Sequence, residues 1–446
     1  MITRSQAISK LFQYLEDDRV TYVIVGDTRG YPKEIHGDTD IVTDPRSLPL
    51  AQQSLLKFCK DYGIKVVQVL QHEHSAWYYV LAWFDKTGKL ITLNPDICSD
   101  FFRFGKLFLR AEEVLTGRVR TVGDNDSCPK LFAPSPPKGF VYYLLKKIDK
   151  GGLDERQGNY LSAQWNRDAE GGMAQVSRFW PDPEAGILAH AARTNDWVPV
   201  RNEIDKFRSA LRQSLGFSVT HWCQEVLRKV RRLFYPTGLT VVFLGSDGSG
   251  KSTIITQIQN DLAPLFRQTK TYHLRPHFGR RMKDDAPVAD PHAQPPRNII
   301  ASCLKLLLYL ADYSIGYCFA ILPRKIRSTL ILFDRYFFDV IIDPKRLRYG
   351  GPRWIPVFLA KCIPTPDLIF YLDAPPEVLL SRKQEISAPE IERQRHAYLD
   401  LTHDLPNAHK IDVSKPLPEV IDSVERVIVE FLESRVIKRL PPGLTT

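Results

Sequence analysis

The chain has 446 residues, of which 43% are apolar and 25% charged, and its formal net charge is +10. This length allows two or three domains that each bury a core, and the composition is that of an ordinary globular protein. The excess of Lys and Arg suits an acidic partner, such as a nucleotide, a nucleic acid, an anionic lipid or a phosphorylated sugar, or it serves solubility alone. The sequence contains neither an aromatic-interleaved basic motif nor zinc-finger spacing. We therefore expect phosphate-bearing small molecules and no specific nucleic acid.

The cysteines and the first residues bear on where the protein works. The seven cysteines are scattered without any Cys-x-x-Cys pair, and residues 1–6 (MITRSQ) do not resemble a secretory signal. An odd number of unclustered cysteines is not typical of a disulfide framework. These features predict a cytoplasmic location, where thiols stay reduced.

The elements of the first half follow a mixed pattern of helices and short strands. A helix is expected at 6–15, and strands are expected at 22–25, 41–42, 77–84 and 89–93. The last two strands flank a turn and form a β-hairpin. From 140 to 234 the helical period dominates, and no strand-like run interrupts it.

Two turn-rich stretches predict the domain boundaries. Residues 133–137 are rich in proline, and residues 235–238 (YPTG) form a linker. The expected division is 1–132, a helical region 133–236 associated with the first domain, and 237–446.

Three carboxylates stand out in the first domain. Gly26 closes the first strand, and Asp38-Thr39-Asp40 follows twelve residues later, directly before the second strand. Alternate residues of a strand point the same way, so Asp38 and Asp40 can face one pair of Mg²⁺ ions. Asp96 lies on a neighbouring strand and would complete such a metal site.

This pattern resembles the polymerase-β-type nucleotidyltransferase superfamily over residues 18–100, with a helical domain behind it. The chain departs from that family at Gly26-Asp27-Thr28, where Gly-Gly or Gly-Ser usually contacts the triphosphate. A carboxylate at Asp27 would repel phosphates unless a metal intervenes. The domain could transfer nucleotidyl groups, or it could only bind a nucleotide or a sugar acceptor.

A complete phosphate-binding loop opens the second half. It follows the apolar run 239–244 and consists of Gly245, Ser246, Asp247, Gly248, Ser249, Gly250, Lys251, Ser252 and Thr253. Its glycines let several backbone N–H groups converge on the β- and γ-phosphates of a nucleotide. Lys251 adds positive charge, the Ser252 hydroxyl suits Mg²⁺, and the helix that begins here directs its positive end at the same anion. ATP and Mg²⁺ are the expected cofactors.

Strands alternate with helices after this loop, which predicts a parallel sheet. The strand 330–333 ends in Asp334, as a Mg²⁺-directed carboxylate should, and the strand 368–372 ends in Asp373. An apolar segment at 299–322 is long enough to cross a bilayer but contains Lys305 and Asp312. For that segment we expect two amphipathic helices with buried faces. Peripheral membrane contact stays open because a basic cluster follows at 324–327.

From Gly238 onwards the chain resembles the thymidylate kinase family of P-loop kinases. The motifs that carry this likeness are Gly245-x-Asp247-Gly248-x-Gly250-Lys251-Ser252-Thr253, Arg275-Pro276, Asp334-Arg335-Tyr336, Pro366-Asp367-Leu368, Leu372-Asp373-x-Pro375 and Ile411-Asp412-Val413-Ser414. The fold class expected for the whole chain is therefore α/β. It is a P-loop kinase with a helix-flanked parallel sheet, preceded by an α+β nucleotidyltransferase-like domain and a helical middle.

The resemblance also implies roles for individual residues. Asp247 would contact a hydroxyl of the acceptor, and Arg275 would hold the acceptor phosphate. Asp334 would serve Mg²⁺, and Arg335 would serve the transferred phosphate, with Tyr336 beside the substrate. A mobile lid would contribute arginines, and the matching residues are Arg382, Arg393 and Arg395.

The chain departs from the thymidylate kinase pattern after Asp334-Arg335-Tyr336. It reads Phe337-Phe338-Asp339, where a small hydroxyl residue is typical, and then carries a basic, turn-rich insert at 343–352. Arg346 and Arg348 in this insert could bind a second anionic group, or they could belong to a solvated loop. The acceptor is therefore a nucleoside monophosphate or another phosphorylated or hydroxyl-bearing small molecule.

Three functions follow from these patterns. The first is an ATP- and Mg²⁺-dependent kinase whose catalytic residues are Lys251, Asp334, Arg335 and Asp247. The second assigns nucleotidyl transfer to the first half, with the P-loop half regulatory. The third is a nucleotide-dependent switch without turnover. The oligomeric state stays open, and a dimer is one option.

Overall fold

The computed structural model describes residues 2–28, 30–33, 35, 37–120, 131–276, 295–382 and 387–440. The chain divides into two compact units, Met1–Arg231 with Leu432–Thr446, and Arg232–Phe431. The expected α/β class is confirmed, because a mixed sheet and a helical region form the first unit and a parallel sheet forms the second.

The first unit is built on a six-stranded mixed sheet with the order β1-β2-β6-β4-β3, in which β5 also pairs with β4. The strands are β1 (Tyr22–Val25), β2 (Thr39–Thr43), β3 (Lys65–Glu73), β4 (Ala76–Phe84), β5 (Leu90–Leu93) and β6 (Pro95–Cys98). The hairpin of β4 and β5 is antiparallel as expected, and β2 runs parallel to β6. The long strand β3 was not predicted from the sequence.

The two faces of this sheet belong to different cores. Tyr22 and Ile24 of β1 pack with helices α1 (Arg4–Asp17) and α2 (Leu48–Tyr62). Val23 and Val25 alternate with them and pack with the helical region on the opposite face. This period of two is the normal consequence of strand geometry, and it makes β1 the border between two hydrophobic layers.

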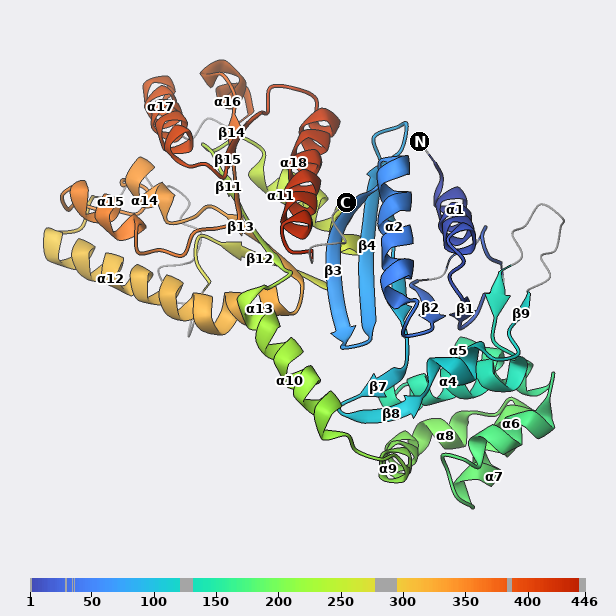
Figure 1. Cartoon of the computed structure of the whole chain (residues 1–446). Coiled ribbons are helices and arrows are strands. Elements are labelled where there is room, and N and C mark those ends of the chain that lie inside the picture. The colour runs from blue at the N-terminus through green and yellow to red at the C-terminus, as the bar shows by residue number, and fades with distance from the viewer. Residues whose placement is uncertain are drawn as a thin grey trace. The chain divides into compact units, whose positions relative to one another are not determined.

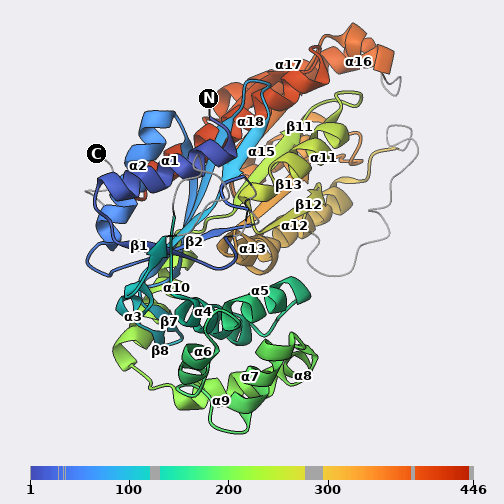
Figure 2. The same ribbon diagram turned by 90° about the vertical axis from the view of Figure 1, so that its right-hand side faces the viewer.

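The helical region confirms the expectation for 140–234. It contains α4 (Pro136–Lys150), α5 (Glu155–Trp165), α6 (Ala169–Val176), α7 (Glu184–Thr194), α8 (Val198–Asn202), α9 (Ile204–Ser214) and α10 (Val219–Phe234), and Figure 2 shows α4 to α9 gathered together. Along the chain, the elements that connect β6 to α4 are β7 (Phe101–Arg103), β8 (Lys106–Leu109), α3 (Ala111–Leu115), β9 (Val119–Arg120) and β10 (Phe132–Ala133). Helix α4 begins at two prolines and ends at Gly151 with φ +73°, the usual start and stop signals of a helix.

The second unit contains a five-stranded sheet with the order β12-β13-β11-β14-β15, and every pairing in it is parallel. Its strands are β11 (Leu239–Leu244), β12 (Gln268–His273), β13 (Thr329–Asp334), β14 (Leu368–Asp373) and β15 (Ala408–Asp412). The central strand β11 is buried along its whole length, as expected for a parallel strand covered on both faces. Ligands of such sheets bind at the carboxyl ends of the strands, and the loop after β11 lies there.

The helices of the second unit include one long apolar run that differs from expectation. They are α11 (Lys251–Asp261), α12 (Ile299–Gly316), α13 (Leu322–Ile326), α14 (Phe338–Ile342), α15 (Trp354–Ala360), α16 (Pro376–Arg382), α17 (Ala388–Asp404) and α18 (Leu417–Ile437), whose residues from Leu432 onwards belong to the first unit. Instead of two helices at 299–322, a π-helical turn at Tyr317–Ile321 joins α12 to α13 in one helical run, Ile299–Ile326. This run is long and apolar enough to cross a membrane, although core helices of globular proteins have the same properties.

Candidate functional site

The loop after β11 has the backbone that a phosphate-binding loop requires. Gly245 has φ +150°, and a Cβ there would lie 2.9 Å from both the Leu372 carbonyl oxygen and Ser249 Oγ. Gly250 has φ +79° and caps the N-terminus of α11. Only glycine adopts both positions without strain, and the free N–H groups at the start of α11 are then available to an anion.

Lys251 is held inside this loop. Its ammonium donates hydrogen bonds to the carbonyl oxygens of Gly245 (2.8 Å) and Ser246 (2.9 Å) and to Ser249 Oγ (3.3 Å). The side chain is buried, and burial together with the nearby Arg335 guanidinium lowers the pKa of Lys251 to about 8. The loop therefore holds the positive charge of Lys251 in place, although burial of the ammonium costs solvation free energy.

The lowered pKa of Lys251 predicts a pH-dependent affinity for ATP. A lysine with a depressed pKa loses its proton as the pH rises, so the protonated fraction falls by about tenfold between pH 7 and pH 9. The dissociation constant of ATP should rise by the same factor, and binding at pH 9 should take up a proton. Calorimetry in buffers of different ionisation enthalpy measures both. An affinity that stays constant from pH 7 to pH 9, with no proton uptake, would contradict this assignment.

Asp247 lies between two arginines. Its carboxylate accepts hydrogen bonds from Arg335 Nη2 and from Arg346 Nη1, each at 2.5 Å. Burial opposes ionisation, but Arg335, Lys251 and Arg346 together hold the pKa of Asp247 well below its usual range. Asp247 is therefore a half-buried anion in the loop itself, and Arg346 of the insert contacts it directly. The other arginine of the insert, Arg348, donates to the Pro295 carbonyl oxygen instead.

Arg335 is the centre of a buried ionic network. Besides Asp247 it binds Asp339, whose carboxylate oxygen lies 2.9 Å from Arg335 Nη1 and whose other oxygen accepts a hydrogen bond from the Tyr398 hydroxyl. The backbone of Arg335 has φ +73°, a left-handed conformation that costs about 1–3 kcal/mol for a residue other than glycine. Such strain persists only where the surroundings enforce it, and here buried carboxylates hold the guanidinium toward the loop.

Asp334 fits the expected metal ligand. It ends β13 beside His273, whose Nδ1 lies 3.6 Å from Asp334 Oδ2. Asp334 Oδ1 is buried and accepts no hydrogen bond from the described residues. This carboxylate oxygen and the hydroxyl of Ser252, the second residue of α11, are suitable protein ligands for Mg²⁺. The described residues contain no group of three acidic, His or Cys side chains that would hold a metal alone, so phosphate oxygens and water would complete the shell.

The remaining residues suggested by the sequence are engaged with protein groups. Arg275 is buried, with Nη1 3.2 Å from Asp312 and its guanidinium 4.7 Å from the centre of the Tyr309 ring. Tyr336 is buried in the core and donates a hydrogen bond to the Pro364 carbonyl oxygen. Among the three arginines suggested for a lid, Arg382 donates to the Val413 carbonyl oxygen, Arg393 binds Glu390 and the Ile342 carbonyl oxygen, and Arg395 binds Asp373.

Two residues of α17 that contribute to the surroundings of the phosphate-binding loop were not predicted from the sequence. Gln394 of α17 accepts a hydrogen bond from Ser246 Oγ (3.2 Å), and Tyr398 follows one turn later and binds Asp339. Gln394 and Tyr398 are four residues apart and therefore lie on the same face of α17, and this spacing is visible in the sequence. Nothing in the sequence said that this face meets the loop, because the two lie about 150 residues apart along the chain.

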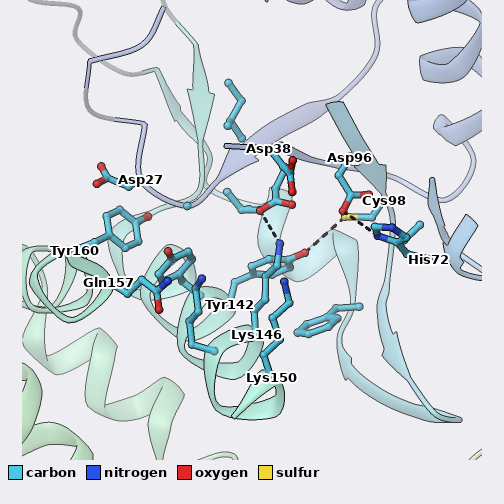
Figure 3. A pocket seen from close by; sticks show the side chains of 18 of the residues that line it. Asp27, Asp38, His72, Asp96, Cys98, Tyr142, Lys146, Lys150, Gln157 and Tyr160 are labelled. Carbon is cyan, nitrogen blue, oxygen red and sulfur yellow. Dashed lines mark hydrogen bonds and ion pairs between the residues drawn. The ribbon is translucent and has the colours of Figure 1, made fainter. Parts of the chain in front are cut away.

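A second polar site lies in the first unit. A cavity of about 370 Å³ is lined by Asp38, which precedes β2, by Asp40 and Asp96 of the sheet, and by Lys146, Lys147 and Lys150 of α4. Figure 3 shows Asp38 and Asp96 on one side of this cavity and Lys146 and Lys150 on the other. Asp40 and Asp96 are direct neighbours in the parallel pairing of β2 with β6, as the sequence predicted. The lysines were missed, although three of them in the last turns of one helix were a visible signal.

The carboxylates of this cavity already have partners in the chain. Lys146 Nζ lies 2.6 Å from Asp40 Oδ2, Tyr78 donates to Asp38 Oδ1 (2.8 Å), and His72 Nδ1 lies 3.8 Å from Asp96 Oδ2. Burial raises the pKa of Asp40, and Lys146 opposes this. Burial also opposes ionisation of Asp96, but the neighbouring His72 and Lys146 lower the pKa of Asp96. In the described parts of the chain these three carboxylates do not form a preformed metal group.

The second unit combines a parallel α/β sheet with a phosphate-binding loop after its central strand. About two fifths of the chain is distantly related in sequence to thymidylate kinases. A probable thymidylate kinase of Archaeoglobus fulgidus is 29% identical over 202 residues, which are 42% of this chain and 93% of that protein. The thymidylate kinase of Leuconostoc citreum is 26% identical over 217 residues, 44% of this chain and 97% of the relative. The thymidylate kinase of Francisella tularensis subsp. holarctica is 26% identical over 203 residues, 40% of this chain and 90% of the relative. No protein-family model matches the chain.

Proposed function

We propose that the second unit is an ATP- and Mg²⁺-dependent phosphotransferase. Its acceptor is a nucleoside monophosphate or another phosphorylated or hydroxyl-bearing small molecule. The observation that carries the proposal is the contact of Asp247 with both Arg335 and Arg346 inside a loop that also encloses Lys251. The distant likeness to thymidylate kinases supports the same class of reaction.

The residues of the loop suit the chemistry of phosphoryl transfer. This reaction needs positioning and positive charge around the oxygens of the transferred group, and little covalent chemistry from the protein. Lys251 and the N–H groups of α11 would hold the β- and γ-phosphates, and Arg335 is fixed nearby by Asp247 and Asp339. Bound Mg²⁺ would neutralise phosphate charge, with Ser252 and Asp334 as its protein ligands.

One residue of the insert at 343–352, Arg346, bears on how the acceptor binds. Arg346 reaches Asp247, the residue that the family resemblance assigns to an acceptor hydroxyl, so a polar acceptor at Asp247 would also meet this guanidinium. Arg346→Ala should raise the KM for the acceptor by about tenfold or more, since a hydrogen bond to a charged group contributes about 1.5–3 kcal/mol. The KM for ATP should change little. Steady-state kinetics with each substrate varied separately distinguish the two, and an unchanged acceptor KM would remove Arg346 from the acceptor site.

A coupled assay tests the function itself. The full chain is incubated with ATP and Mg²⁺ and a panel of nucleoside monophosphates and phosphorylated sugars, and both ADP and the phosphorylated product are measured. ADP formation that depends on one acceptor, with the matching product, is the expected result. Binding of ATP without transfer to any tested acceptor would favour a nucleotide-dependent switch instead.

A second candidate function is nucleotidyl transfer in the first unit, which the three carboxylates and three lysines of one cavity favour. For a metal ion to bind there, the ion pair between Asp40 and Lys146 would have to break so that Asp40 could bind the ion. Lys146 would then be available to contact phosphates. Asp38→Asn with Asp40→Asn should then abolish pyrophosphate release from nucleoside triphosphates, while Lys251→Ala spares it. Release that depends on Lys251 instead, or no release at all, would count against transfer by this unit.

A further inference from the structure

In the first unit, a lysine of the chain lies at the carboxylates that resemble a metal site. Asp40 and Asp96 are direct neighbours in the pairing of β2 with β6, and the ammonium of Lys146 lies 2.6 Å from Asp40 Oδ2. The side chains of Lys146 and Asp40 are only 17% and 18% exposed. Figure 3 shows Lys146 pointing from α4 toward Asp38 and Asp96. The chain therefore places a cation of its own where a divalent ion would bind these carboxylates.

The other acidic residues that line the cavity of the first unit are also engaged. His72 lies beside Asp96. The remaining partners are Tyr78 for Asp38, Arg156 for Asp27, Arg103 for Glu73, and backbone N–H groups for Asp100 and Asp154. Each acidic group of the lining thus has a partner among the described residues, and that partner is neither Lys147 nor Lys150.

Lys147 and Lys150 differ from the other charged groups of the cavity. Both line it, and neither forms an ion pair with a residue that the structure describes. Lys147 Nζ lies 4.8 Å from the centre of the Tyr143 ring instead. Burial and the neighbouring lysines of α4 lower the pKa of both side chains, because like charges are crowded here. An anion bound by these two ammonium groups would relieve their repulsion.

We propose that the cavity of the first unit binds a phosphate-bearing small molecule through Lys147 and Lys150, and that Lys146 takes the place of a divalent cation at Asp40. A cavity of about 370 Å³ is large enough for such a ligand, and lysine is a common phosphate-binding residue. This inference does not depend on the kinase activity of the second unit. It is the alternative to nucleotidyl transfer in the first unit, since that reaction needs metal ions at the same carboxylates.

Calorimetric titration of the full chain with inorganic pyrophosphate tests the proposal. The chain carries Lys251→Met, so that the phosphate-binding loop of the second unit contributes less, and it is titrated in EDTA and in excess Mg²⁺. Binding in EDTA should be at least as tight as in Mg²⁺, because bound Mg²⁺ lowers the negative charge of the anion. Binding that requires Mg²⁺ would favour nucleotidyl transfer and overturn the proposal. The absence of binding in both solutions would overturn it too.

Substitutions assign the binding to the cavity. Lys147→Gln with Lys150→Gln should weaken pyrophosphate binding at least about tenfold, because charged hydrogen bonds to the phosphates are lost. The fold should persist, since neither side chain belongs to the core, and circular dichroism checks this. The matched control is Lys60→Gln with Lys86→Gln, which removes two exposed lysines of the same unit that do not line the cavity. The control should bind like the parent chain, and equal losses in both double variants would overturn the proposal.

Discussion

Replacing Lys251 with methionine should lower the rate of phosphoryl transfer by at least about 10³-fold. The ammonium is enclosed by the loop, where it donates to Gly245, Ser246 and Ser249. It is therefore preorganised for phosphate oxygens and needs little rearrangement when they arrive. Methionine keeps much of the length and volume of the side chain but removes the charge. The rate is measured with the best acceptor from the coupled assay, at saturating ATP.

The control for this variant is Lys415→Met, which removes an exposed lysine from the same unit. Its rate should stay within about twofold of the wild type, since substitutions of exposed residues away from special sites have small effects. The melting temperatures of both variants should lie close to that of the wild type or, for Lys251→Met, above it. The buried ammonium costs solvation, as its lowered pKa indicates. A Lys251→Met enzyme with near-normal transfer would refute the proposed phosphotransferase site.

The second large effect is expected at Arg335. Arg335→Met should destabilise the second unit by about 3–5 kcal/mol, because it leaves buried carboxylates without their partner. The side chain of Arg335 is 6% exposed and that of Asp339 only 2%, and their charged atoms lie 2.9 Å apart. For a unit of this size the melting temperature should fall by roughly 10 °C. Differential scanning calorimetry of the full chain measures it, and the transition of the second unit is expected to be the one that ADP and Mg²⁺ shift to higher temperature in the wild type.

Two further variants separate charge burial from other causes. Adding Asp339→Asn to Arg335→Met should recover part of the lost stability, since the uncompensated charge at 339 is then gone. Arg426→Met breaks an ion pair with Asp422 whose side chains are 48% and 37% exposed, and it should change stability by no more than about 0.5 kcal/mol. If Arg335→Met and Arg426→Met destabilised the protein equally, the buried network around Arg335 would not be the stabilising feature described above.

The local motifs were predictable because their chemistry depends on neighbours in sequence. Gly245 and Gly250 need their positive φ angles for the loop to curl, and Lys251 lies at a fixed spacing within the same turn. The buried strands before Gly245 and Asp334 were legible as unbroken apolar runs, so the parallel sheet followed from them. Asp40 and Asp96 were also correctly expected on neighbouring strands.

The sequence by itself determined the phosphate-binding loop motif, the α/β class and the carboxylates that line the first unit's cavity. Only the tertiary structure decided their partners. Asp247 receives Arg346 from 99 residues away, and Asp40 receives Lys146 from 106 residues away. A buried charge must find an opposite charge or hydrogen bonds, but which residue supplies them depends on how distant segments pack. The periodicity of a single segment contains no information about that choice.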